Sequence, residues 1–175
     1  MKKTRKMLSN WEADYIQSLM HLIETQSKET LATWAMEYAR ENLLPLWVAY
    51  FPEDHRPRMA LEAGHDWVEG IIKLPVAKKI ILECHSAARD AEEYPVAQAA
   101  ARAIAQSAST IHSARHCIGL AFYGALAISY SKLGIDAKWT DLESYAAGEC
   151  KKMEEALEKI SVKDEKNPAK ISWKC

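Results

Sequence analysis

An alanine-rich run between residues 97 and 108 is the feature that most constrains how this chain folds. Seven of these twelve residues are alanine, and a nearly apolar stretch follows at 117–128. Alanine loses no side-chain entropy in a helix, so the run favours helix strongly. After Pro95 no proline occurs before residue 132, and the apolar residues recur at helical spacing. We therefore predict one long helix over 95–132, apolar nearly all round and surrounded by other helices.

The rest of the chain shows helical periodicity with few interruptions. Glycine and proline together number twelve in 175 residues, well under the usual combined share of roughly 12%. A β-sandwich or barrel needs a turn about every 8–12 residues, which this composition does not provide. We expect an all-α, single-domain bundle of about six helices around the long alanine-rich helix. The predicted helices lie near 11–24, 27–47, 57–71, 76–91, 95–132 and 140–160, and Pro45 should kink or end the second.

The breaks in periodicity divide the chain into three segments. Residues 1–26 are predicted to form an N-terminal extension with a short helix, and residues 27–160 the helical domain. Residues 161–175 are charged, contain Pro168 and lack periodicity, so we expect a loose C-terminal tail with Trp173 as its one candidate anchor.

Charge and cysteine usage exclude several classes of protein. The chain has 23 basic and 24 acidic residues, so it lacks the excess of positive charge that nucleic-acid-binding proteins use. The longest nearly apolar run is shorter than the about 20 residues that a membrane span needs. No export signal follows the basic start, and the four cysteines form no Cys-x-x-Cys pair. We therefore expect a cytoplasmic protein with reduced thiols that binds neither membrane nor nucleic acid.

Histidines are the candidate metal ligands. His112 and His116 are four residues apart, so on a continuous helix they lie on one face, one turn apart. Two imidazoles at this spacing can share one metal, with His65 or His85 on another helix as the third ligand. Tyr123 extends this polar stripe and is a candidate binding residue. The alternative, which we favour, is that the histidines hydrogen-bond neighbouring groups and hold the bundle in register.

The segment 52–58 is the second candidate site, through Asp54, Arg56 and Arg58. The two arginines beside Pro57 are able to clamp a phosphate or carboxylate. We favour the alternative that Arg56 pairs with Asp54, or with a carboxylate on another helix, and pins the loop. The sequence contains no glycine-rich phosphate loop, Walker motif or Gly-x-Ser-x-Gly elbow.

The string Pro52-Glu53-Asp54-His55-Arg56-Pro57-Arg58, together with the alanine-rich segment that leads into Ile111-His112-Ser113-Ala114-Arg115-His116, carries a resemblance. It resembles the immunity proteins of bacterial polymorphic toxin systems, of the immunity-five-like helical type, over roughly residues 30–160. The resemblance implies an all-α cytoplasmic protein that binds and neutralises a cognate toxin domain without catalysing a reaction. The residues that match recurring polar positions of the family are Asp54, Arg56, Arg58, His112 and His116.

Two alternatives stay open beside the immunity hypothesis. The first is a metal-binding helical-bundle enzyme, similar to DinB-like proteins, which use a His-x-x-x-His pair and a third histidine. His112 and His116 with His65 or His85 imitate that arrangement, and a divalent metal would then be required, whereas the immunity hypothesis needs no cofactor. The second is a helical scaffold that self-associates, so a homo-oligomer also stays open.

Overall fold

The computed structural model describes residues 4–174, and within this range the protein contains eight α-helices and no β-strand. This confirms the predicted all-α fold. The helices are α1 (Asp14–Ile23), α2 (Lys28–Asn42), α3 (Leu44–Tyr50), α4 (Arg56–Val68), α5 (Leu74–Asp90), α6 (Pro95–Ser109), α7 (Leu126–Leu133) and α8 (Trp139–Ile160). A 3₁₀ helix, η1 (Ala114–Ile118), and a π-helix, η2 (Leu120–Ala125), connect α6 to α7.

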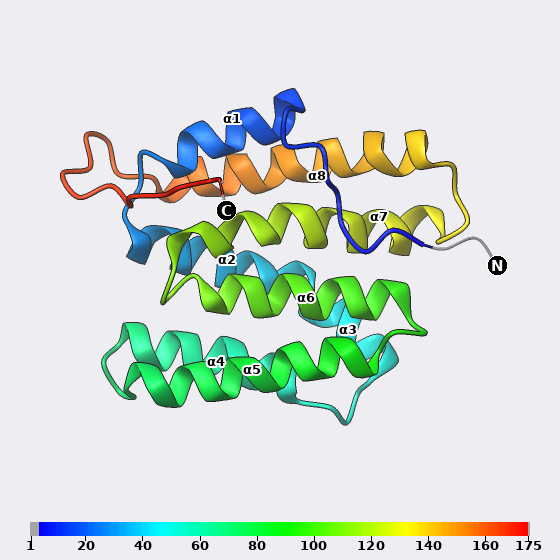
Figure 1. The fold of residues 1–175 in the computed structure, drawn as a ribbon, viewed down its shortest axis with the longest axis horizontal. Helices are drawn as coiled ribbons and strands as arrows, with labels where there is room; N and C mark the ends of the chain where they lie inside the picture. The colour runs from blue at the N-terminus through cyan, green and yellow to red at the C-terminus, as the bar shows by residue number, and fades with distance from the viewer. Residues whose placement is uncertain (1–3, 175) are drawn as a thin grey trace.

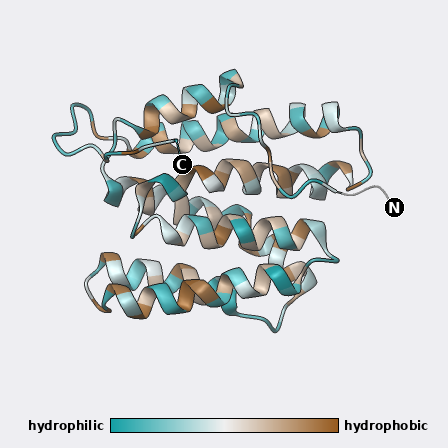
Figure 2. Ribbon diagram, in the orientation of Figure 1, coloured by the Kyte–Doolittle hydropathy of each residue, from teal (hydrophilic) through white to brown (hydrophobic). Residues whose placement is uncertain are grey.

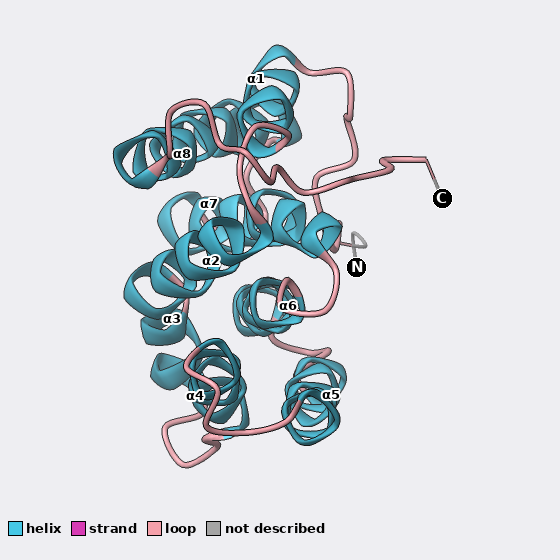
Figure 3. Ribbon diagram, turned by 90° about the vertical axis from the view of Figure 1, so that its left-hand side faces the viewer, coloured by secondary structure: helices cyan, strands magenta, loops and turns pink. Residues whose placement is uncertain are grey.

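The alanine-rich helix α6 lies at the centre of the bundle, as the sequence predicted. It packs against α2, α3, α4, α5 and α7, and twelve of its fifteen residues are buried. Figure 3 shows α6 between the α4–α5 pair and the layer that contains α2 and α7, while α1 and α8 form the outermost layer on that side. Small side chains allow this, because they let several backbones approach one helix closely.

The prediction of one uninterrupted helix over 95–132 is wrong. Helix α6 ends at Ser109, residues 110–113 form a turn, and η1, η2 and α7 then return along α6 (Figure 1). A continuous helix of this length would extend about 57 Å, too far for a small domain to cover. Folding back buries the apolar stretch 117–128 against α6. At the break, the Thr110 hydroxyl donates to the Gln106 carbonyl at 3.3 Å, a bond that competes with helix continuation.

The second predicted helix is also divided, in the way that its proline indicated. Helix α2 ends at Asn42 and α3 begins at Leu44, with Pro45 in the first turn of α3, where a missing N–H costs nothing. This break and the break after Ser109 account for the difference between about six expected helices and eight. The outer helices are amphipathic, and Figure 2 shows both hydrophobic and hydrophilic bands along α5 and α8.

Both terminal segments are held against the bundle. In the N-terminal segment the Leu8 N–H donates to the Phe122 carbonyl on η2 at 2.9 Å. The described part of the tail after α8 contains no helix, and two hydrogen bonds join it to the N-terminal part of the chain. The Ala169 N–H donates to the Gln26 carbonyl at 2.8 Å, and the Trp173 indole donates to Glu24 at 2.6 Å. Trp173 is therefore an anchor of the tail.

Three of the four cysteines lie in the core. Cys84, Cys117 and Cys150 are free thiols buried in the core, and burial raises the pKa of each. Cys175 lies outside the described residues.

None of the helices in residues 4–174 combines the length and the apolar character that crossing a membrane requires.

Replacing Ala103 by leucine is expected to destabilise the protein. Ala103 is fully buried on α6, and a Cβ placed on Gly124 would lie 3.4 Å from its methyl group, so α6 and η2 are in close contact there. Extra carbons would push the two elements apart, at a cost of about 1–3 kcal/mol in the free energy of unfolding. Urea denaturation of Ala103→Leu tests this. The matched control is Ala49→Leu at an exposed position of α3, which should leave stability unchanged.

Candidate functional site

The segment between α3 and α4 is built around the Asp54 carboxylate. Asp54 Oδ1 accepts a hydrogen bond from the Arg56 backbone N–H at 3.1 Å, at the start of α4. The Arg56 guanidinium pairs with the same carboxylate, with Nη2 2.6 Å from Oδ2. Its Nη1 lies 2.9 Å from Asp90 Oδ2 on α5. The structure therefore confirms the favoured pairing of Arg56 with Asp54. It shows in addition a pairing with Asp90, a carboxylate on another helix.

This network fixes the loop in one conformation. The Trp47 indole N–H donates to the Asp54 carbonyl at 2.8 Å, and the ring itself is buried against alanines of α5 and α6. Hydrogen bonds from Arg56 hold the pKa of the Asp54 carboxyl below its ordinary value, and the same bonds raise the pKa of Arg56. Both groups are therefore charged at neutral pH, and Arg56 is committed to the loop.

Beside the loop lies an open cleft of about 650 Å³ with a largely apolar lining that includes Tyr50, Phe51 and Met59. The Tyr94 ring centroid lies 5.2 Å from that of Phe51 and 5.8 Å from that of Tyr50. Tyr50 and Tyr94 are each 45% exposed, and Met59 is 48% exposed. Tyrosine, methionine and arginine are enriched at protein–protein interfaces, so the chemistry of this cleft suits docking of another protein.

The other two candidate binding residues, Arg58 and Tyr123, do not line the cleft. Arg58 is exposed on the first turn of α4. Tyr123 is half-buried on η2 and packs against the main core.

The structure brings three of the four candidate histidines together and separates the fourth. His112 lies in the turn after α6 and His116 on η1, so the prediction that they share one face of a helix is wrong. Their rings nevertheless meet edge to face, with centroids 5.1 Å apart. His85 on α5 acts electrostatically on His116 and is itself influenced by His112. His65 on α4 instead has Arg40, Glu37, Glu69 and Asp66 as its charged neighbours.

Of the candidate histidines, His116 forms a side-chain hydrogen bond, whereas His112 Nδ1 and His65 Nε2 are buried without a hydrogen-bond partner in the described part of the chain. His116 Nδ1 lies 2.8 Å from Gln106 Oε1 on α6, which links η1 to the central helix. Within residues 4–174, no group of three or more histidine, cysteine, aspartate or glutamate residues is arranged to hold a metal ion. Burial lowers the pKa of His85, His112 and His116, that of His116 to about 4, so these imidazoles are neutral at pH 7.

Acid should destabilise the protein through His116. Its pKa is about 4 in the folded state and about 6.5 when unfolded. The unfolded chain therefore takes up the proton first, and stability is lost as pH falls from about 6.5 towards 4. Partial exposure limits the expected loss to about 1–2 kcal/mol. The same sign holds for His85 and His112.

Urea denaturation at about pH 7.5 and about pH 5 measures this dependence. His116→Asn keeps a donor near the Nδ1 position and should reduce the loss of stability between the two pH values. The control is His21→Asn, at an exposed position of α1. An equal pH dependence in the wild type and in His116→Asn would show that His116 does not control it.

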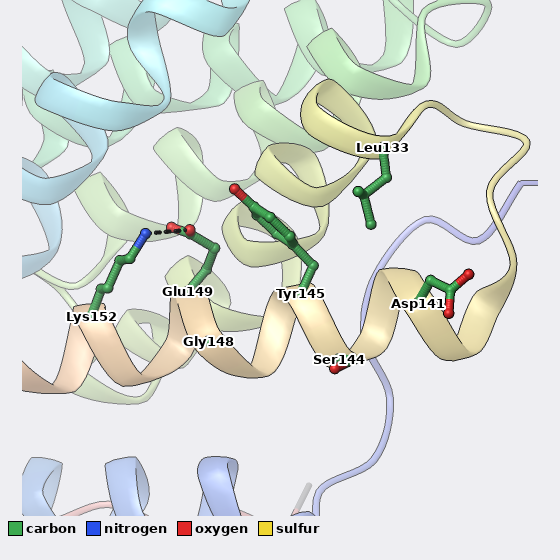
Figure 4. Close-up of a pocket in the computed structure, with 7 residues that line it drawn as sticks. All are labelled: Leu133, Asp141, Ser144, Tyr145, Gly148, Glu149 and Lys152. Atoms are coloured by element: carbon green, nitrogen blue, oxygen red, sulfur yellow. Dashed lines mark hydrogen bonds and ion pairs between the residues drawn. The ribbon is translucent and has the colours of Figure 1, made fainter.

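Another cleft, of about 540 Å³, lies where the end of α7 faces α8 (Figure 4). Figure 4 shows Tyr145, Glu149 and Lys152 on one side of α8, with Leu133 of α7 opposite. Glu149 is only 6% exposed, and its carboxylate pairs with Lys152 Nζ at 2.8 Å. Burial raises the pKa of Tyr38 to about 12, and the Glu149 charge adds to the shift.

Glu149 is not among the candidate residues predicted from the sequence, although its position in the helix is a signal. It occupies a position of the apolar stripe of its helix, between Ala146 and Met153, where a carboxylate is unexpected. Lys152 follows three residues later, which is the spacing of a helical ion pair.

Replacing Asp54 by asparagine should loosen the loop. The change removes the charge that both orders Arg56 and caps α4, and the expected loss is about 1–2 kcal/mol in the free energy of unfolding. Thermal and urea denaturation measure the loss. Glu53→Gln, one residue away and exposed, removes the same charge and should have no effect beyond experimental error.

One known protein family matches most of the chain. The family described as Imm-5 like putative immunity protein matches residues 21–156, a segment that runs from α1 into α8 and includes both the loop and the histidines. No curated protein and no solved structure matches the chain. The family match confirms the resemblance found in the sequence and extends it towards the N-terminus. Because the match covers more than three quarters of the residues, the chain belongs to the Imm-5 like putative immunity protein family.

Proposed function

We propose that this protein is an immunity protein that binds a cognate bacterial toxin domain and neutralises it, without catalysing a reaction. The observation that carries the proposal is the family match over residues 21–156. As the resemblance implies, the proposal places the protein in the cytoplasm of the cell that produces the toxin.

The cleft beside the Asp54 loop is the surface that we propose for the toxin. Tyr50 and Met59 are exposed in its lining, and Tyr94 is exposed beside Tyr50. Tyrosine and methionine are both enriched at protein–protein interfaces. The Asp54–Arg56–Asp90 network already holds the loop, so little conformational entropy remains to be lost on docking. Neutralisation then follows from steric occlusion of the active site of the toxin by the docked bundle.

The experiment is co-expression with the toxin domain encoded beside the gene for this protein. The wild type should restore growth and co-purify with the toxin as a stoichiometric complex. The variant Tyr50→Ala/Met59→Ala should weaken the complex by about tenfold or more, because each truncation removes about 1 kcal/mol or more of contact. Ile71→Ala, at a position that is 65% exposed and does not line the cleft, is the matched control. If the wild type forms no complex and gives no protection, the proposed function is wrong.

A further inference from the structure

A cluster of arginine and imidazole side chains is contributed by α5, by α6 and by the segment 112–116, and both α5 and η1 pack against α6. We call His85, Arg89, Arg102, His112 and His116 the cationic cluster. His85 and Arg89 are one turn apart on α5, and Arg102 is one turn from Gln106 on α6. Gln106 in turn holds His116 at 2.8 Å, and His112 packs its ring against that of His116. The Cys84 thiol, next to His85, donates to the carbonyl of Ala101, next to Arg102, at 3.5 Å. This contact places the α5 part of the cluster beside its α6 part.

The side chains that act electrostatically on the three imidazoles are arginines, lysines and the imidazoles themselves. Those that act on His85 are Arg89, Arg102 and His112. His112 is influenced by Lys28 and Lys78, and His116 by Arg115 and the other two histidines. Among residues 4–174, the side chains that shift the pKa values of the three imidazoles are all basic, although the whole chain carries a net charge of −1.

The arginines of the cluster are also without acidic partners. Among residues 4–174, neither Arg89 nor Arg102 forms an ion pair with a carboxylate. Arg89 donates to the Ser86 hydroxyl at 2.6 Å, which positions its guanidinium without neutralising it. This differs from Arg56, whose charge is compensated by Asp54 and Asp90.

A neighbouring cleft is also lined by basic side chains. This cleft, of about 440 Å³, is lined by His112, Lys28 and Lys170, and Glu29 is the one carboxylate in its lining. An unpaired guanidinium beside half-buried polar groups is suited to bind a carboxylate through two parallel hydrogen bonds. Arg102 and the three imidazoles are half-buried and Arg89 is exposed. The cluster therefore offers an anion a partly buried site, in which the one carboxylate of the neighbouring cleft is Glu29.

We propose that the cationic cluster binds carboxylate side chains of an acidic surface segment on the toxin partner. The inference rests on the proposed immunity function, and the helix α5 connects the two surfaces. Asp90, at the end of α5, joins the network of the aromatic cleft, and Arg89 precedes it in the same turn. One partner can therefore contact both surfaces along α5. A nucleic acid is the less suitable occupant, because the near-neutral chain offers one compact cluster where phosphate binding uses an extended basic face.

The first arm of the test uses a capped oligoglutamate peptide and the full-length protein, without any toxin. Titration followed by NMR should move the imidazole signals of His85, His112 and His116. The variant Arg89→Gln/Arg102→Gln should bind the peptide about tenfold more weakly, because two charge-assisted contacts are lost. Arg102→Lys keeps the charge and should bind more tightly than the double variant, and thermal denaturation shows that each variant is folded.

Charge-matched and ligand-matched controls make this arm decisive. Lys151→Gln/Lys159→Gln removes two exposed positive charges from α8 and should leave binding unchanged. Equal weakening in both double variants would show non-specific attraction and overturn the inference. The inference is equally wrong if the wild type binds oligoglutamine as well as oligoglutamate, or if it binds a DNA duplex more tightly than the acidic peptide.

The second arm uses the cognate toxin domain. Arg89→Gln/Arg102→Gln should weaken the complex with the toxin by about tenfold, and more so at low salt. If the wild type binds the toxin and the double variant binds it equally well, the cluster is not the docking site, while the immunity function stands. If the wild type does not bind the toxin at all, the proposed function fails, and the peptide arm still reports on the cluster itself.

Discussion

Replacing Trp34 by alanine is expected to lower the free energy of unfolding by about 3–5 kcal/mol. Trp34 on α2 is 2% exposed, and its indole N–H donates to the Met153 carbonyl on α8 at 2.9 Å. The side chain therefore both fills the space between the two helices and joins them by a hydrogen bond. Alanine would leave a large cavity that the surrounding rigid helices cannot close. Urea denaturation with circular dichroism measures the loss directly.

Trp34→Phe separates the two contributions of the indole. Phenylalanine retains most of the apolar volume and loses the donor, so the expected cost is about 1–2 kcal/mol. A loss in Trp34→Phe as large as that in Trp34→Ala would show that the hydrogen bond, and not the packing, holds α8 to α2. A loss below about 1 kcal/mol in Trp34→Ala would contradict the assigned core position.

The parts of the fold that local patterns determine were predictable from the sequence. Apolar residues at helical spacing indicated most of the helices, and Pro45 indicated the break between α2 and α3. The break after Ser109 was not predictable, because serine and threonine are tolerated in helices and no proline or glycine marks it. What ends the helix is the burial of 117–128 against α6, a gain between segments that local periodicity does not report.

In the candidate site, contacts between residues close in sequence were also predictable, and contacts set by helix packing were not. Asp54 and Arg56 are two residues apart, so their pairing could be proposed from the sequence, whereas the choice of Asp90 as the second partner depends on the α4–α5 packing. His85 acts electrostatically on His116 only because α5 and η1 both pack against α6. Spacing along the chain suggested two imidazoles on one helical face, whereas His112 lies in a turn and His116 on η1, with their rings edge to face.

Phe122→Ala should destabilise the protein by about 3–5 kcal/mol and also release the terminal segments. Phe122 is 1% exposed on η2, and its ring centroid lies 4.5 Å from that of Trp11. Trp11 in turn contacts Trp173 of the tail, with centroids 6.2 Å apart. Loss of the phenyl ring therefore removes a core side chain and the support under both termini. Urea denaturation measures the first effect, and hydrogen exchange of the Leu8 amide measures the second.

The two effects can be distinguished because the Leu8 N–H donates to the backbone carbonyl of Phe122, which the substitution leaves in place. If the ring holds the N-terminal segment, protection of this amide should fall by more than the global loss of stability explains. Phe122→Leu fills most of the space and should restore much of the stability without restoring the aromatic contact to Trp11. A Leu8 amide in Phe122→Ala that loses protection only in step with global unfolding would show that the hydrogen bond alone anchors the segment.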